Sequence, residues 1–188
     1  MGSDDDIGAR ASRYAARHDL SLGPPLGHGR DGDVHSTIGG AGGPTALKLF
    51  AREPAYGRER DCYRRLRAHG VSDVQGHHVP QLLASDDELP AIEMTIVVPP
   101  YLLDFAGAHL DEAPEFPDHV MEEWQREKQD QFGDRWPAVQ LLLATLSGSL
   151  GIHLVDVNPG NITFSEGEDA SPSPREPRPH CRAPDLTS

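Results

Sequence analysis

Short apolar runs separated by glycine clusters and polar turns occupy the first half of the chain. Val, Ile, Thr and Leu alternate with polar residues in these runs, which is typical of strands in a half-buried sheet. The clusters between them are rich in Gly, Pro, Ser and Asp, residues that favour turns. The pattern predicts five strands, at residues 20–26, 34–38, 45–50, 80–84 and 91–98.

A helical pattern interrupts these runs at residues 54–69, and Gly70 supplies a C-terminal stop. Its apolar positions are spaced three and four residues apart, so they share one face of a helix. Glu59 lies on this face, between Tyr56 and Tyr63. A carboxylate in an apolar stripe needs a partner, which makes Glu59 a candidate functional residue.

The second half of the chain is predicted to be helical. A charged helix is expected over 117–132, and Asp134 is a candidate cap for a further helix that Gly151 ends. The apolar stripe of this last helix predicts that it packs into the core. A polar loop then lies between two short apolar runs, at 152–155 and 162–164.

Both ends of the chain differ in composition from its centre. Residues 1–18 are polar and charged and are interpreted as a flexible arm. From 165 to 188 the chain is rich in Pro, Ser and charged residues, a composition that cannot bury a core and predicts disorder.

Overall charge and cysteine content narrow the possible functions. The chain has 188 residues and a formal net charge of −13, which disfavours nucleic acid as a partner because phosphates attract basic surfaces. No apolar run is long enough for a membrane span, and no secretory leader is evident. Cys62 and Cys181 alone give neither a disulfide framework nor a zinc site. We therefore expect a cytoplasmic protein.

A glycine-rich segment provides the first candidate for chemistry. Gly27, Gly29, Gly32 and Val34 fit the pattern G-x-G-x-x-G-x-V. In a dinucleotide-binding turn a helix would follow, whereas the β-branched residues from Val34 onward predict a strand. The segment is thus either a flap over phosphates or an ordinary hairpin turn.

Lys48 provides the second candidate. It lies in the apolar run 45–50, where a buried ammonium group is costly unless it is paired. Glu59, on the following helix, is the natural partner. The alternative is an edge lysine whose ammonium group reaches solvent.

The third candidate is the polar loop between Asp156 and Asn161. The segment His-Leu-Val-Asp-Val-Asn-Pro-Gly-Asn resembles the catalytic loop of protein kinases, in which Asp and Asn are separated by four residues. Taken in isolation, it could also be a simple turn, since Asn, Pro and Gly are turn formers. Glycine loop, Lys48, Glu59 and this loop follow one another in the order of the protein-kinase family.

The resemblance implies an α+β, protein-kinase-like fold. An antiparallel five-stranded N-lobe with one helix would span 19–98, and a reduced helical C-lobe would span 99–164 and end after the catalytic-type loop. ATP and Mg²⁺ would be the cofactors, and an unknown protein or small molecule the acceptor. Asp156 would act as the base, Lys48 would contact the phosphates and Asn161 would hold the metal ion. The nucleotide site would also include the glycine-rich segment, Ala46 of the A-x-K motif, Glu59, and Val97 and Val98 of the hinge.

Departures from the family leave the activity open. No Asp-Phe-Gly motif follows Asn161, and Leu154 stands where the family has His. Three hypotheses remain: a minimal ATP-dependent phosphotransferase, a pseudokinase that binds nucleotide and signals through a partner, and a fold relic that binds only a partner.

Overall fold

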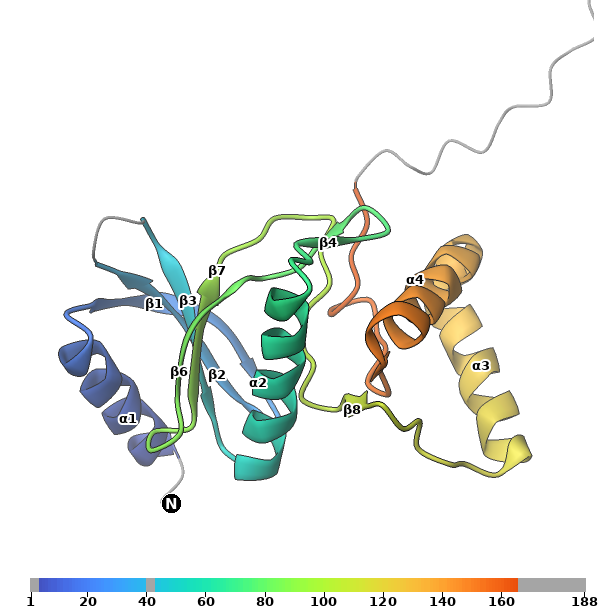
Figure 1. The fold of residues 1–188 in the computed structure, drawn as a ribbon. Coiled ribbons are helices and arrows are strands. Elements are labelled where there is room, and N and C mark those ends of the chain that lie inside the picture. The colour runs from blue at the N-terminus through green and yellow to red at the C-terminus, as the bar shows by residue number, and fades with distance from the viewer. Residues whose placement is uncertain (1–3, 40–42, 166–188) are drawn as a thin grey trace, which may run out of the picture.

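The computed structural model describes residues 4–39 and 43–165. They form a mixed α+β fold, with an antiparallel sheet in the first half and a helical hairpin in the second (Figure 1). Residues 166–188 of the expected tail lie outside the described part of the chain.

The sheet has the five expected strands, in the order β1-β2-β3-β7-β6, and each neighbouring pair is antiparallel. The prediction of a five-stranded antiparallel sheet is confirmed. The sequence underestimates the length of the first strand, which continues into the glycine-rich segment. The strands are β1 Ser21–Gly29, β2 Gly32–Ile38, β3 Thr45–Phe50, β6 Leu82–Asp86 and β7 Ala91–Thr95.

The expectation of a flexible arm is wrong for residues 4–17. Residues Asp4–Arg17 form helix α1, which packs on the sheet (Figure 1). Ile7, Ala11 and Tyr14 are spaced four and three residues apart, so they form a buried stripe within a segment whose overall composition is polar. This stripe packs with Leu47 and Leu49 of β3 in a small core of its own.

Helix α2, Glu53–Ala68, covers the opposite face of the sheet (Figure 1). The expected face is buried, including Glu59, and Gly70 follows the helix with a left-handed φ of 64°. Successive residues of β3 point to opposite faces of the sheet. Leu47 and Leu49 pack in the core with α1, and Ala46 and Phe50 pack in the core with α2. By this alternation Lys48 lies on the α2 face.

The helical hairpin consists of α3 Asp118–Phe132 and α4 Trp136–Leu150, with the 3₁₀ turn η1 Gly133–Arg135 between them. Asp134 does not cap α4, because it lies within this turn. Arg135 occupies the N-cap position of α4, and its side chain makes no capping hydrogen bond there. Gly151 ends the helix as expected, with a left-handed φ of 61°. The apolar stripe of α4 is buried in the main core.

Two short ladders lie outside the main sheet, one a local hairpin and the other between distant parts of the chain. β4 Asp73–Val74 pairs with β5 His77–His78, and β8 His109–Leu110 pairs with β9 Ile152–His153. A single bridge also links Leu102 to Ile162. These pairings bring the segment after the sheet beside the polar loop that follows α4.

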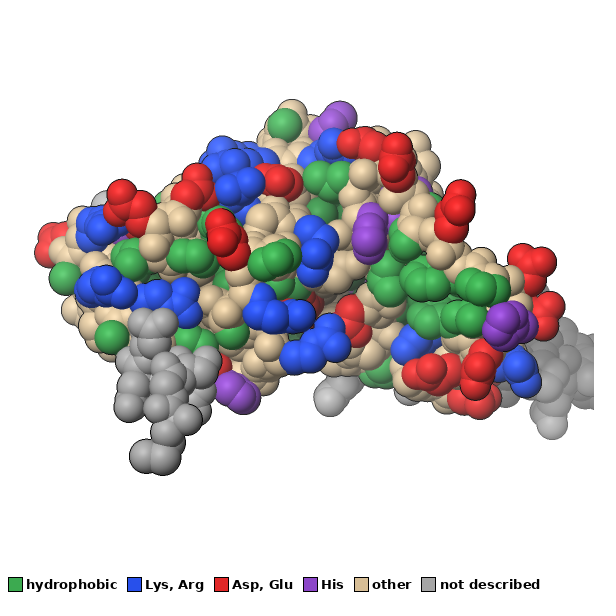
Figure 2. All heavy atoms as spheres, turned by 90° about the horizontal axis from the view of Figure 1, so that it is seen from below, with side chains coloured by type: hydrophobic (Ala, Val, Ile, Leu, Met, Phe, Trp, Pro, Cys, Tyr) green, Lys and Arg blue, Asp and Glu red, His purple; other side chains and the backbone are tan. Residues whose placement is uncertain are grey.

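The surface carries both signs of charge. Figure 2 shows acidic and basic side chains interspersed on the lower face, with a group of hydrophobic side chains toward α3. Phe116, just before α3, and Val120, within α3, are exposed hydrophobic residues. No helix in the described part of the chain is long and apolar enough to cross a membrane.

Candidate functional site

A cavity of about 430 Å³ lies between the β1–β2 hairpin, the sheet and the segment that follows β7. Most of the residues singled out in the sequence line it, although they come from distant parts of the chain. Two of them do not line the cavity. Val98 is 67% exposed, and Asp156 is also exposed. The cavity brings together Gly27, Gly29, Gly32, Val34, Ala46, Lys48, Glu59, Val97 and Asn161.

A buried ion pair lies at the inner wall of the cavity. The Lys48 ammonium group donates a 2.7 Å hydrogen bond to the Glu59 carboxylate, and the two side chains are 10% and 1% exposed. Burial raises the pKa of Glu59 to about 7, against the opposing effect of Lys48. Burial also disfavours the charge of Lys48, but the Glu59 and Asp104 carboxylates outweigh it and raise the Lys48 pKa. The pair therefore fixes an ammonium group beside the cavity.

Asp104 is a second carboxylate on Lys48, and the sequence assigned it no role. Its Oδ1 lies 3.3 Å from the Lys48 ammonium nitrogen and also accepts a 3.1 Å bond from the Ala106 amide. Asp104 has a left-handed φ of 62°, a conformation that Asp tolerates better than most residues. In the sequence, the only hint of a role for Asp104 is that Phe105 follows it, as in an Asp-Phe-Gly motif. The kinase motif lies after the catalytic loop, however, whereas Asp104 lies before the polar loop.

The glycine-rich segment is a tight hairpin that lines the cavity. Gly29 pairs with Gly32 across a turn made by Arg30 and Asp31. Gly32 has a φ of 153°, and a Cβ at this position would lie 1.8 Å from the Leu49 carbonyl oxygen. Only glycine fits there. Arg52 forms an ion pair with Asp31 that ties the turn to the start of α2.

The polar loop is organised mainly by Asn158. Its Oδ1 accepts hydrogen bonds from the amides of Gly160 and Asn161, at 2.9 and 3.2 Å. Its Nδ2 donates a 3.1 Å bond to Asp156 Oδ1. The Asn161 carbonyl oxygen in turn accepts a 2.8 Å bond from the Leu103 amide. The loop therefore holds Asn161 at the cavity and leaves Asp156 exposed.

The oxygen donors that line the cavity can hold a divalent cation only if a bound ligand contributes further oxygens. The described residues contain no group of three or more His, Cys, Asp or Glu side chains that could hold a metal ion. Asp104 and Asn161 do line the same cavity, and they offer a carboxylate and an amide oxygen. Mg²⁺ is commonly held by one or two carboxylates together with phosphate oxygens and water.

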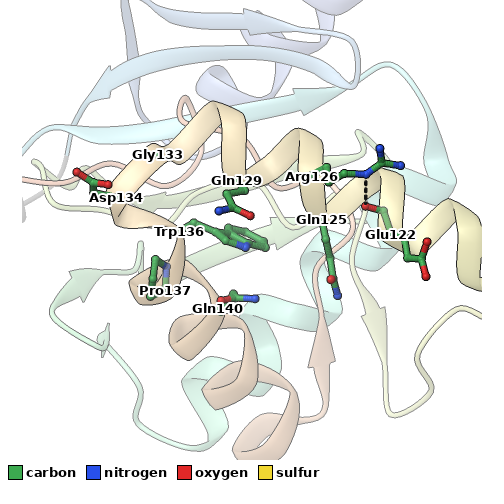
Figure 3. A pocket seen from close by; sticks show the side chains of 9 residues that line it. All are labelled: Glu122, Gln125, Arg126, Gln129, Gly133, Asp134, Trp136, Pro137 and Gln140. Carbon is green, nitrogen blue, oxygen red and sulfur yellow. Dashed lines mark hydrogen bonds between the residues drawn. The ribbon is translucent and has the colours of Figure 1, made fainter.

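A larger cavity, of about 690 Å³, lies between α3 and α4 (Figure 3). Trp136 and three glutamines contribute to its lining, and its charged residues Glu122, Arg126 and Asp134 are exposed. The one hydrogen bond drawn there, from Arg126 Nε to the Glu122 carbonyl oxygen, is 3.3 Å long. No buried charged side chain lines this cavity, so we place the candidate site at Lys48.

Comparison with known proteins leaves the family open. No protein-family model and no curated protein matches the chain. Among solved structures it is similar to the Rio2 kinase–ADP/Mg²⁺–phosphoaspartate complex from Chaetomium thermophilum, with 18% identity, a TM-score of 0.36 and 66% of this chain covered. The match spans 42% of that kinase. A TM-score this low does not establish a shared fold, so the interpretation of the cavity depends on its own residues.

Proposed function

We propose that this protein binds ATP in the cavity between the glycine hairpin and the Lys48–Glu59 pair, in a protein-kinase-like arrangement. The observation that carries the proposal is the buried ion pair. It costs free energy to desolvate two charges, and such a pair is often no better for stability than apolar residues of the same size. A functional reason for keeping the ammonium group at the cavity wall is the binding of an anionic ligand.

The rest of the cavity suits the other parts of a nucleotide. Val34, Ala46 and Met94 contribute apolar side chains that can pack against a base, and Thr95 to Val97 also line the cavity. The glycine hairpin allows the backbone to approach phosphates closely. Lys48 would contact those phosphates while Glu59 holds its orientation.

Phosphoryl transfer to a protein or small-molecule acceptor is the second candidate function. The Asp156–Asn161 loop favours it, because Asp156 is exposed where it could accept a proton from an acceptor hydroxyl. Asp104 and Asn161 would hold Mg²⁺, which supplies charge neutralisation for the phosphates when bound. Nucleotide binding without transfer, as in a pseudokinase, is the alternative that turnover measurements must separate.

A titration with ATP, ADP and adenosine, each with and without Mg²⁺, tests the proposal. Binding should stabilise the folded protein by about 2.7 kcal/mol at a hundredfold excess over the dissociation constant, which a thermal melt detects. We expect the two phosphorylated ligands to give a larger shift than adenosine in the presence of Mg²⁺. If ATP and ADP leave the melting temperature unchanged and calorimetry detects no heat of binding, the nucleotide proposal is wrong.

A further inference from the structure

Helix α3 packs against the rest of the protein along only one half of its length. Its buried residues are Lys128 and Phe132, both in the C-terminal half, and Phe132 stacks on Trp136 of α4 with ring centroids 6.2 Å apart. Trp124, in the middle of the helix, meets the same ring edge-on at 5.9 Å. None of the described residues 118–123 is buried. The N-terminal half of α3 is therefore left largely uncovered by the described part of the chain (Figure 1).

Apolar side chains continue along this uncovered half. Val120 and Trp124 are four residues apart, so they lie on the same side of the helix. Val120 is 37% exposed, and Phe116, which immediately precedes the N-cap residue Pro117, is 44% exposed. Exposed apolar side chains that gather on one surface are typical of sites that contact other molecules. The apolar side of α3 is thus covered by α4 at its C-terminal end and open at its N-terminal end.

The same stretch of chain is strongly acidic. Residues 111–123 contain six acidic residues and no Lys or Arg, and Asp111 is paired with Arg65. The other five are exposed, and none of their side chains forms a hydrogen bond or an ion pair with a described residue: Glu112, Glu115, Asp118, Glu122 and Glu123. Asp118 complements the positive end of the helix dipole, but Glu122 lies one turn further on, where like charges repel. Most of this acidic charge is therefore available to a positively charged partner.

We propose that residues 112–124, the open face of α3, bind a basic amphipathic helix of a partner protein. The apolar stripe of such a helix would pack on Phe116 and Val120, while its Lys and Arg side chains would meet the neighbouring carboxylates. A second copy of this chain would bring like charges together on the same face, and an anionic membrane surface would be repelled in the same way. None of these residues lines the cavity at Lys48, so the inference is independent of nucleotide binding.

A synthetic helical peptide of about 18 residues, with a stripe of Leu and with Lys at the other positions, is the probe. Two further peptides are its controls: one has Glu in place of every Lys, and the other has the same composition but no Leu stripe. Calorimetry measures the affinity. Trp124 and Trp136 are the two tryptophans of the chain, so a change in tryptophan fluorescence reports binding at the α3–α4 hairpin itself. We expect the wild type to bind the basic amphipathic peptide and neither control.

Two double variants separate the apolar contacts from the charged ones. Phe116→Ser/Val120→Ser removes the exposed apolar side chains and should weaken binding of the basic peptide by at least about tenfold, the change that 1.4 kcal/mol produces. Glu115→Gln/Glu123→Gln removes two carboxylates and should weaken binding by about threefold at low salt, with a smaller further loss of affinity as salt is added. All four positions are exposed, so urea unfolding should find both variants about as stable as the wild type.

Leu141→Ser and Asp130→Asn are the matched controls. Leu141 is 56% exposed on α4, and Asp130 is exposed in the C-terminal half of α3, so both substitutions should leave the affinity unchanged. If the wild type fails to bind the basic peptide, or if the controls weaken binding as much as the double variants do, the proposal is refuted. A wild-type dimer that Phe116→Ser/Val120→Ser dissociates would refute it in favour of a second copy. Binding of the wild type, and not of this variant, to phosphatidylserine vesicles would refute it in favour of a membrane.

Discussion

Lys48 of β3 and Glu59 of α2 form a buried ion pair with a nitrogen–oxygen distance of 2.7 Å, and this pair joins the sheet to the helix at the wall of the cavity. Neither residue can be replaced alone without leaving the other charge buried. The pair therefore has measurable consequences for both stability and ligand binding.

Replacing Lys48 by Met should destabilise the protein by about 3–5 kcal/mol at pH 8, because Glu59 must then either remain charged without its buried partner or take up a proton that the unfolded chain does not hold at this pH. Urea unfolding measures this loss. Adding Glu59→Gln should recover part of it, since the buried charge is then removed. If the single and double variants are equally stable, the two charges are not coupled.

The double variant Lys48→Met/Glu59→Gln also tests whether Lys48 contacts phosphate. Lys48→Met/Glu59→Gln should bind adenosine about as well as the wild type does and lose most of the additional affinity for ATP, because only the phosphates are expected to meet the ammonium group. Calorimetry with both ligands measures the difference. Undiminished ATP affinity would exclude Lys48 from the binding site.

Glu59 should make stability depend on pH. Its pKa is raised from 4.5 to about 7 on folding, so the folded state holds the proton more tightly than the unfolded state does. Its contribution to the free energy of unfolding is thus complete below about pH 4.5 and is lost as the pH rises through 7. The stability of the wild type relative to Glu59→Gln should fall by roughly 2–3 kcal/mol between pH 5 and pH 8. A flat difference across this range would contradict the raised pKa.

The glycine hairpin contains one glycine that the backbone requires and one that it does not. Gly32→Ala should cost about 2–4 kcal/mol, because the new Cβ would collide with the Leu49 carbonyl oxygen. Gly27→Ala is the matched control, since nothing lies within 4 Å of a Cβ there, and should change stability by less than about 0.5 kcal/mol. Equal effects of the two substitutions on the melting temperature would show that the hairpin has a different backbone.

Asp156 separates a phosphotransferase from a protein that only binds nucleotide. Asp156→Asn should reduce any turnover by about 10²–10⁴-fold, the usual contribution of a general base, while ATP affinity stays within about twofold because Asp156 does not line the cavity. Asn158→Ala is the control for loop structure, since it removes the acceptor of the Gly160 and Asn161 amides. Unchanged turnover of Asp156→Asn in an active protein would remove this residue from the reaction.

Helix α1 should be an integral part of the fold. Tyr14 is fully buried, and its hydroxyl donates a 3.1 Å hydrogen bond to Glu93. Tyr14→Phe should cost about 1 kcal/mol, and Tyr14→Ala about 3–5 kcal/mol. If Tyr14→Ala melts within a degree of the wild type, α1 does not contribute to the core.

The sequence by itself determined the helices and strands that follow from the local pattern of apolar and polar residues. Apolar periodicity predicted the five strands and α2, and Gly70 and Gly151 marked helix ends because left-handed backbone favours glycine. It also paired Lys48 with Glu59, since a charge in an apolar pattern requires a partner nearby. It missed α1 because four buried residues are too few to offset the polar composition of that segment.

Only the tertiary structure decided which residues share the cavity. Asp104 reaches Lys48 through a left-handed backbone and through the hydrogen bond between Leu103 and Asn161, which joins segments far apart in the chain. Asp156, five residues before Asn161, remains outside the lining because Asn158 directs the turn. Such placements depend on packing and long-range hydrogen bonds, and periodicity along the chain carries no information about them.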